Sequence, residues 1–151
     1  MPFTSYEKIY ERFLRKIKDF DIAEFLSSED EEIQSFVEDM LWGFLEASIS
    51  KFTKCIQDLS NRDDEQKGFN LDLSDIEQEI LALMMIDEWI MPQLNSTENT
   101  LQFIGGTNTK FYAQANQLDK LQSLEEKSRI KARKLIRDYT YQVYKSKLRK
   151  N

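Results

Sequence analysis

Residues 74–91 read SDIEQEILALMMIDEWIM, and the predicted fold is built around these residues. Ser74 and Glu77 have the spacing of a capping box, in which a hydroxyl and a carboxylate each bind a free amide at a helix start. Between Ile80 and Ile86 the chain is apolar nearly all round, and a helix without a polar face is usually central in its domain. The stretch therefore predicts a core helix, which Pro92 is expected to end or kink.

A first helix is predicted over residues 5–18, where apolar side chains recur at helical steps. Thr4 and Glu7 repeat the capping-box spacing at its start. Residues 60–70 are polar and charged and are expected to form an exposed loop.

A second helix of about 30 residues is predicted over residues 29–59, again from apolar periodicity. Ser28 and Glu31 suggest its capping box, and the acidic run that follows Ser28 suits the positive end of a helix dipole. Gly43 is expected to mark a close helix crossing or a bend. Aromatic residues at helical spacing are more often core than cofactor site, so we predict that two sets are buried: Phe36, Met40 and Phe44, and Tyr6, Phe13 and Phe20.

The stretch 95–116 is the least regular part of the chain. It is rich in Asn, Ser and Thr, contains Gly105-Gly106, and also carries aromatic residues. We predict a long irregular loop that is either folded back on the core or kept for a partner. A last helix is expected from about Asn116, running as far as Leu148. The predicted fold is all-α, a bundle of about four helices with two long members. Residues 1–142 form its single domain and residues 143–151 a basic C-terminal tail.

Composition supports one folded domain. The chain has 151 residues, 40% hydrophobic and 32% charged, with only four Gly and two Pro. Histidine is absent, which excludes Ser-His-Asp catalysis and histidine-ligated metal sites. Cys55 is the only cysteine, so an intramolecular disulfide is excluded, and we expect a small buried hydrophobic residue there. The charged N-terminus and the short apolar runs predict a soluble protein of a reducing compartment, without signal peptide or membrane span.

Charge is unevenly distributed along the chain. Residues 127–151 contain ten Lys or Arg and one acidic residue, a net charge of +9, whereas residues 1–126 carry −15. Three interpretations are open. The bases can be a solvated helix face near a helix C-terminus, they can meet the acidic body of a like subunit, or they can contact nucleic-acid phosphates with help from neighbouring tyrosines. Those tyrosines are Tyr139, Tyr141 and Tyr144.

No catalytic motif stands out. Asp87 and Glu88 interrupt the most apolar helix, but adjacent helical positions do not face each other, so we expect a partner such as an Arg of the last helix. Gly105-Gly106 lacks the Lys and Ser/Thr of a phosphate loop and is expected to form a turn. We therefore predict no enzyme activity, no cofactor and no metal; an enzyme that uses only carboxylates is the remaining alternative.

Four segments, in this order, resemble the head–tail connector proteins of tailed bacteriophages, also described as adaptor or neck proteins. The segments are SDIEQEILAL (74–83), EWIMPQLNSTE (88–98) with Trp89, Pro92, Asn95 and Glu98, KFYAQAN (110–116) and RDYTY (137–141). The resemblance covers about residues 30–141. It implies a structural protein of the virion neck that is assembled in the host cytoplasm. Its partners would be copies of itself in a ring, usually dodecameric, the portal protein and the next neck or tail protein, with non-specific contact to channel DNA and no contact with a membrane.

The resemblance also implies two sets of contact residues. A protruding terminus that engages the portal or lines the DNA channel would use Lys145, Lys147, Arg149 and Lys150. Contacts between neighbouring subunits would use Leu101, Phe103, Ile104, Phe111, Tyr112, Arg133 and Arg137. The competing hypothesis is a helical nucleic-acid-binding or packaging-accessory protein that uses its basic last helix.

Overall fold

The computed structural model describes residues 1–17, 29–104 and 109–149; of residues 98–104, 109–112 and 114 it describes only the backbone. The described chain is a helical bundle with one very small sheet, which confirms the predicted all-α class. The elements are β1 (Thr4–Ser5), α1 (Tyr6–Lys16), α3 (Glu31–Lys51), β2 (Arg62–Asp63), β3 (Gly68–Phe69), α4 (Asp75–Ile104) and α5 (Thr109–Arg149). None of the helices among the described residues is long and apolar enough to span a membrane.

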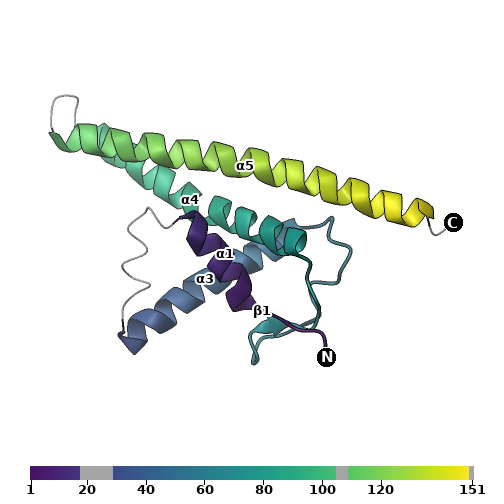
Figure 1. Ribbon diagram of the computed structural model, residues 1–151. Coiled ribbons are helices and arrows are strands. Elements are labelled where there is room, and N and C mark those ends of the chain that lie inside the picture. The colour runs from purple at the N-terminus through teal and green to yellow at the C-terminus, as the bar shows by residue number, and fades with distance from the viewer. Residues whose placement is uncertain (18–28, 105–108, 150–151) are drawn as a thin grey trace.

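Helix α4 is the core helix, as predicted. The Ser74 amide donates to Glu77 Oε1 at 2.8 Å and the Glu77 amide donates to Ser74 Oγ at 3.3 Å, so the capping box forms. The apolar turns that follow are almost fully buried, among them Ile80, Leu81, Met85, Ile86 and Ile90. Figure 1 shows α4 lying between α5 above and α1 and α3 below, and it contacts all three.

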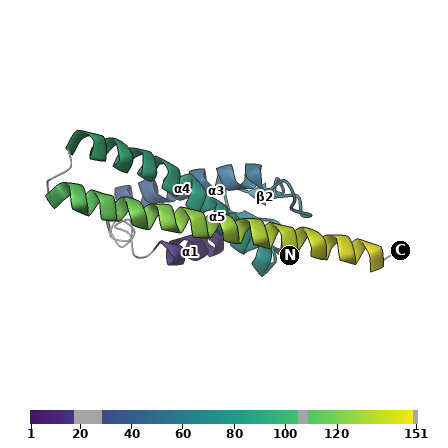
Figure 2. The same cartoon turned by 90° about the horizontal axis from the view of Figure 1, so that it is seen from above.

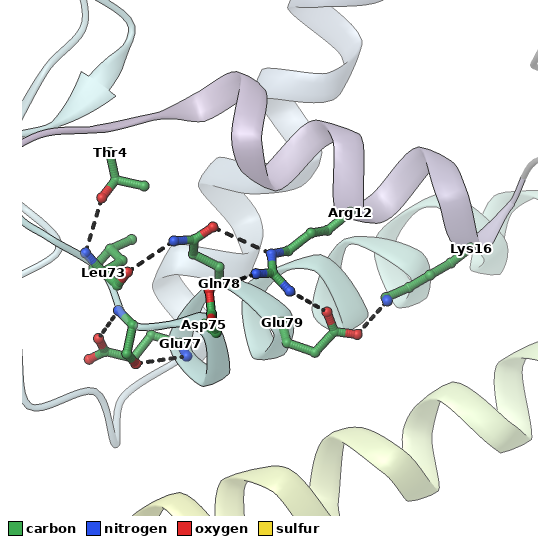
Figure 3. A network of polar contacts seen from close by, with 9 residues as sticks. Thr4, Arg12, Lys16, Leu73, Asp75, Glu77, Gln78 and Glu79 are labelled. Atoms are coloured by element: carbon green, nitrogen blue, oxygen red, sulfur yellow. Dashed lines mark hydrogen bonds and ion pairs between the residues drawn. The ribbon is translucent and has the colours of Figure 1, made fainter.

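Polar contacts fix α1 against the first turns of α4 (Figure 3). The Arg12 guanidinium donates to Gln78 Oε1 at 3.4 Å, to Glu79 Oε2 at 3.1 Å and to Asp75 Oδ1 at 3.0 Å. Lys16 pairs with the other oxygen of Glu79, and Lys131 of α5 lies 3.7 Å from it. Glu79 therefore links α1, α4 and α5.

The sheet and the cap of α3 correct two predicted capping boxes. Thr4 lies in β1, and its hydroxyl donates to the Leu71 carbonyl at 2.6 Å instead of capping α1. The N-cap of α1 is Ser5, without a side-chain hydrogen bond. Helix α3 is capped by Asp30, which accepts from the Glu32 amide at 3.0 Å, and Ser28 lies outside the described residues. The N-cap of α1 follows Thr4 by one residue, and Glu31 is the first residue of α3 and not the third, as the predicted box required.

The small sheet lies within and beside the stretch predicted as an exposed loop. Strand β3 is central, with β1 and β2 antiparallel on either side of it. Phe69 is fully buried, and a Cβ on Gly68 would lie 2.2 Å from the Phe3 ring, so only glycine fits where these strands meet.

Helix α3 is shorter than predicted. It ends at Lys51, and the Phe52 amide closes the last turn on the Ser48 carbonyl at 3.0 Å. Phe52 and Leu59 are buried, yet they reach the core from irregular chain. Apolar periodicity continued past the helix end because these side chains pack against the same core. The inner face of α3 is formed by Val37, Leu41, Leu45 and Ser48, whereas Phe36, predicted to be buried, is 70% exposed.

The predicted irregular loop over residues 95–116 is wrong. Helix α4 continues through Pro92 to Ile104, and α5 begins at Thr109. Proline removes only one intrahelical amide donor, and the Thr97 hydroxyl donates to the Gln93 carbonyl at 2.8 Å within the same helix. Burial of Leu94 and Thr97 outweighs the weak helix propensity of this polar stretch. Residues 105–108, with Gly105-Gly106, lie outside the described part.

Residues 143–149, predicted as a tail, are the last turns of α5. At 1.5 Å per residue this helix is about 60 Å long. In both views its C-terminal end extends past the rest of the molecule (Figures 1 and 2).

Candidate interaction surface

Helix α5 packs on the body through one face only. Leu121, Ser128 and Tyr139 are buried there. Partly buried residues continue the same face at helical steps, namely Leu118, Leu124, Ala132, Leu135, Ile136 and Val143. Val143 is the last of them, so contact with the body ends about two turns before the helix does.

Tyr139 fastens this face to the start of α4. Its hydroxyl donates to Glu77 Oε2 at 2.8 Å and accepts from the Ile56 amide at 2.9 Å. Its ring meets Phe52 edge-on, with centroids 5.6 Å apart. The side chain thus ties three segments together: α5, the α4 cap and the chain that follows α3.

Glu77 is 2% exposed although it carries a carboxylate. Besides Ser74 and Tyr139 it accepts a hydrogen bond from Gln57 Nε2 at 2.8 Å. Burial by itself would raise the pKa of Glu77, but the hydrogen bonds from Ser74, Tyr139 and Gln57 outweigh burial and hold the pKa below its usual value. The buried group is therefore an ionised, hydrogen-bonded anchor.

Cys55 lies beside this anchor and is half-buried, outside any helix, not inside a helix as predicted. Its Sγ is 3.4 Å from Glu77 Oε2. Burial, followed by the nearby Glu77 charge, raises the pKa of Cys55 to about 11, although a backbone hydrogen bond from Gln57 opposes the rise. The thiol is protonated at neutral pH and is a poor nucleophile. No cluster of potential metal ligands occurs among the described residues.

Asp87 and Glu88 pair with a lysine of α3, not with an arginine of the last helix as predicted. Lys51 Nζ contacts Glu88 and lies 3.6 Å from Asp87 Oδ2. The hydrogen bond to Glu88 is the main cause of the raised pKa of Lys51. Lys51 and Asp87 line a groove of about 150 Å³ together with Arg133 of α5. Such a groove is small for a cofactor.

The outer face of α5 carries a second stripe that points away from the body. Its members follow alternating steps of three and four residues, and all are exposed: Lys127, Ile130, Lys134, Arg137, Tyr141, Tyr144 and Leu148. We call this set the outer stripe of α5. Its four apolar or aromatic side chains are each 56–60% exposed. Lys145 lies beside it, with Nζ 5.6 Å from the Tyr141 ring centroid.

The structure places only some of the predicted contact residues on this surface. Lys145, Lys147 and Arg149 lie on the projecting end of α5 and are exposed, and Lys150 is outside the described residues. Arg137 belongs to the outer stripe, with Nε 4.0 Å from its neighbour Asp138. The predicted contact residues of the former loop lie in α4 and α5, and their side chains are not described: Leu101, Phe103, Ile104, Phe111 and Tyr112.

The outer stripe of α5 was not predicted from the sequence, because the inner face of the same helix has the same periodicity and more aliphatic residues. The stripe could have been found from its basic residues, which recur at the three- and four-residue spacing of one helix face. The projecting end and outer stripe of α5 together form the candidate interaction surface.

Comparisons of this chain with models of protein families, with curated proteins and with solved structures found no match.

Proposed function

We propose that this protein is a structural connector that acts by assembly, as its resemblance to phage head–tail connectors implies, and that α5 is its docking element. The observation that carries the proposal is the projecting end of α5. Every residue from Tyr144 to Arg149 is exposed, and Tyr144 and Leu148 are 60% and 57% exposed. Large apolar side chains on a projecting basic helix are typical of a surface that a partner covers.

In this proposal the connector acts as a ring of identical subunits. A head-to-tail contact needs two different, complementary surfaces on each copy. The basic outer stripe of α5 and the acidic body provide surfaces of opposite sign for the subunit contact, since residues 127–151 carry +9 and residues 1–126 carry −15. Lys145, Lys147 and Arg149, which lie off that stripe on the projecting end, would then contact the portal.

Sedimentation of the full chain, alone and with portal rings from the genome that encodes it, tests the proposal. We expect the chain to bind the portal, and we expect the variant Lys145→Ser/Lys147→Ser/Arg149→Ser to lose that binding. A matched control changes three exposed bases elsewhere, namely Lys8, Arg15 and Lys54, to serine and should bind normally. A chain that stays monomeric and ignores portal rings would contradict the proposal.

A second candidate function is nucleic-acid binding by the same helix. The basic residues and tyrosines of the outer stripe favour it, since phosphates and bases are bound by such side chains. The strongly acidic body opposes it. Binding of a duplex in a gel-shift assay, lost between about 50 and 200 mM salt, would support this function. Absence of binding at the lower concentration would exclude it.

A further inference from the structure

Helix α3 has an exposed stripe of its own on the face opposite its buried one. Its members follow alternating steps of four and three residues, and all are exposed: Glu32, Phe36, Asp39, Gly43, Glu46 and Ser50. We call this set the outer stripe of α3. Its three carboxylates form no ion pair among the residues that the structure describes. The stripe therefore presents free negative charge around a single aromatic residue.

Packing within a single chain does not account for a phenylalanine at position 36 or a glycine at position 43. Phe36 is 70% exposed, which is unusual for a phenylalanine within a helix. A Cβ on Gly43 would meet nothing within 4 Å, so no packing in this chain requires a glycine there, although glycine weakens a helix. The two residues are two helical turns apart on one face. Together they provide an exposed aromatic ring, which a partner could bury, and a position without a side chain, where another helix can approach closely.

The outer stripes of α3 and α5 complement each other. Both repeat with the three-and-four spacing that places side chains along a helix–helix seam. One carries Glu32, Asp39 and Glu46, and the other carries Lys127, Lys134 and Arg137. At 1.5 Å per residue the stripes span about 27 Å and about 32 Å, so their lengths also agree.

These two stripes do not meet within one chain. Helix α4 separates α5 from α3, and the start of α3 and the C-terminal end of α5 lie on opposite sides of the molecule (Figure 1). Contact between them requires two copies. Because the joined surfaces differ, a joined pair of copies keeps one free stripe of each kind, which permits a closed ring.

We infer that the outer stripe of α5 in one copy packs against the outer stripe of α3 in the next copy, and that this joint builds the oligomer. The inference deepens the proposed connector function and rests on it. Lys145, Lys147 and Arg149 are not part of the stripe, so these three side chains stay available for another partner.

A charge-reversal experiment tests this joint. One variant carries Glu32→Lys, Asp39→Lys and Glu46→Lys, and the other carries Lys127→Glu, Lys134→Glu and Arg137→Glu. In sedimentation velocity the wild-type chain should associate as concentration rises, and each variant alone should remain a monomer, because its two stripes then have like charge. Mixing the variants should restore association, since each intact stripe meets an intact partner and the two reversed stripes also complement each other.

Matched controls separate this joint from general charge effects. The variant Glu7→Lys/Glu11→Lys/Glu65→Lys has the same charge change at exposed acids off both stripes and should associate like wild type. The neutral change Phe36→Ser should weaken association about tenfold or more, since buried aromatics dominate interfaces. Ile56→Ser, at an exposed site off both stripes, should leave association unchanged. Circular dichroism checks that each variant is folded.

Three results would overturn the inference in different ways. If the wild type associates and the reversal variants associate equally, or their mixture stays monomeric, another surface forms the oligomer and the connector proposal stands. If the wild type remains a monomer both alone and with portal rings, the joint and the proposed function fail together. Loss of duplex binding in the α5 variant, with association unchanged, assigns the stripe to nucleic acid and also overturns the joint.

Discussion

Glu77 connects the start of the core helix to the helix proposed for docking. One carboxylate closes the capping box of α4, accepts from Gln57 and accepts from Tyr139 of α5. A buried carboxylate is costly unless its oxygens are hydrogen-bonded, and here both are. The position of α5 on the body therefore depends on a polar contact as well as on apolar packing.

Replacing Tyr139 by phenylalanine should destabilise the fold by about 1–3 kcal/mol. The ring would still pack on Phe52, but the Ile56 amide would lose its acceptor and Glu77 would lose a donor. Urea unfolding followed by circular dichroism measures the change. Tyr141→Phe, at an exposed site, is the matched control and should leave the midpoint unchanged. Equal midpoints for wild type and Tyr139→Phe would contradict the anchor role.

Stability should fall in acid. The pKa of Glu77 in the folded chain lies below the usual value of about 4.5, because its hydrogen bonds outweigh the opposing effect of burial. The pKa of Glu79 is also lowered, since contacts with Lys16 and Arg12 outweigh burial. A lowered pKa stabilises the fold above the unfolded-state value, and this stabilisation is lost as the pH falls through the folded-state value. Urea midpoints between pH 7 and about pH 3 should therefore decrease, and less steeply in Glu77→Gln. A flat profile would argue against ionised, paired carboxylates at these positions.

Helix α3 contains a glycine that lowers its helix propensity although no neighbouring atom excludes a larger residue. This glycine is Gly43. At Gly68, by contrast, a Cβ would collide with the Phe3 ring and approach the Thr4 carbonyl at 2.9 Å. The first glycine reflects no constraint inside the chain and the second reflects a close backbone approach.

Gly43→Ala should therefore stabilise the isolated chain by about 0.5–1 kcal/mol, the usual difference between these residues inside a helix. Gly68→Ala should destabilise it, since the Phe3 ring and the strand backbone must move. Thermal unfolding of both variants under conditions where the chain is monomeric tests the pair. A decrease in Tm for Gly43→Ala would show that the glycine is required by the fold itself.

Taken as a whole, the molecule has an acidic body and one long basic helix, so its association should depend on salt. Raising NaCl from about 50 to about 500 mM shortens the screening length from more than 10 Å to a few ångströms and should weaken exposed charge pairs across the proposed joint. Sedimentation at several salt concentrations measures this effect. Association that strengthens with salt would indicate a mainly apolar contact, centred on Phe36, Tyr141, Tyr144 and Leu148, instead of a charge-complementary one.

The helical class, the core helix and its capping box could all be predicted from local sequence. Residues 74–91 combine a local cap with apolar side chains all round, and both signals act within a few residues of each other. Composition also located the basic segment over residues 127–151, because counting Lys and Arg along the chain suffices for that.

The ends of the helices and the exposure of individual residues depend instead on long-range packing. Residues 95–104 are helical because they extend a packed core helix, which outweighs their weak propensity. Phe36 and Val37 are neighbours of similar hydrophobic character, yet Val37 lies on the buried face of α3 whereas Phe36 is 70% exposed. The buried pairing of Glu77 with Tyr139 joins residues 62 positions apart. Helix ends, side-chain exposure and long-range contacts all depend on which surfaces of the chain meet in space. Sequence periodicity predicts that a helix has an apolar face, but it does not predict which element covers that face.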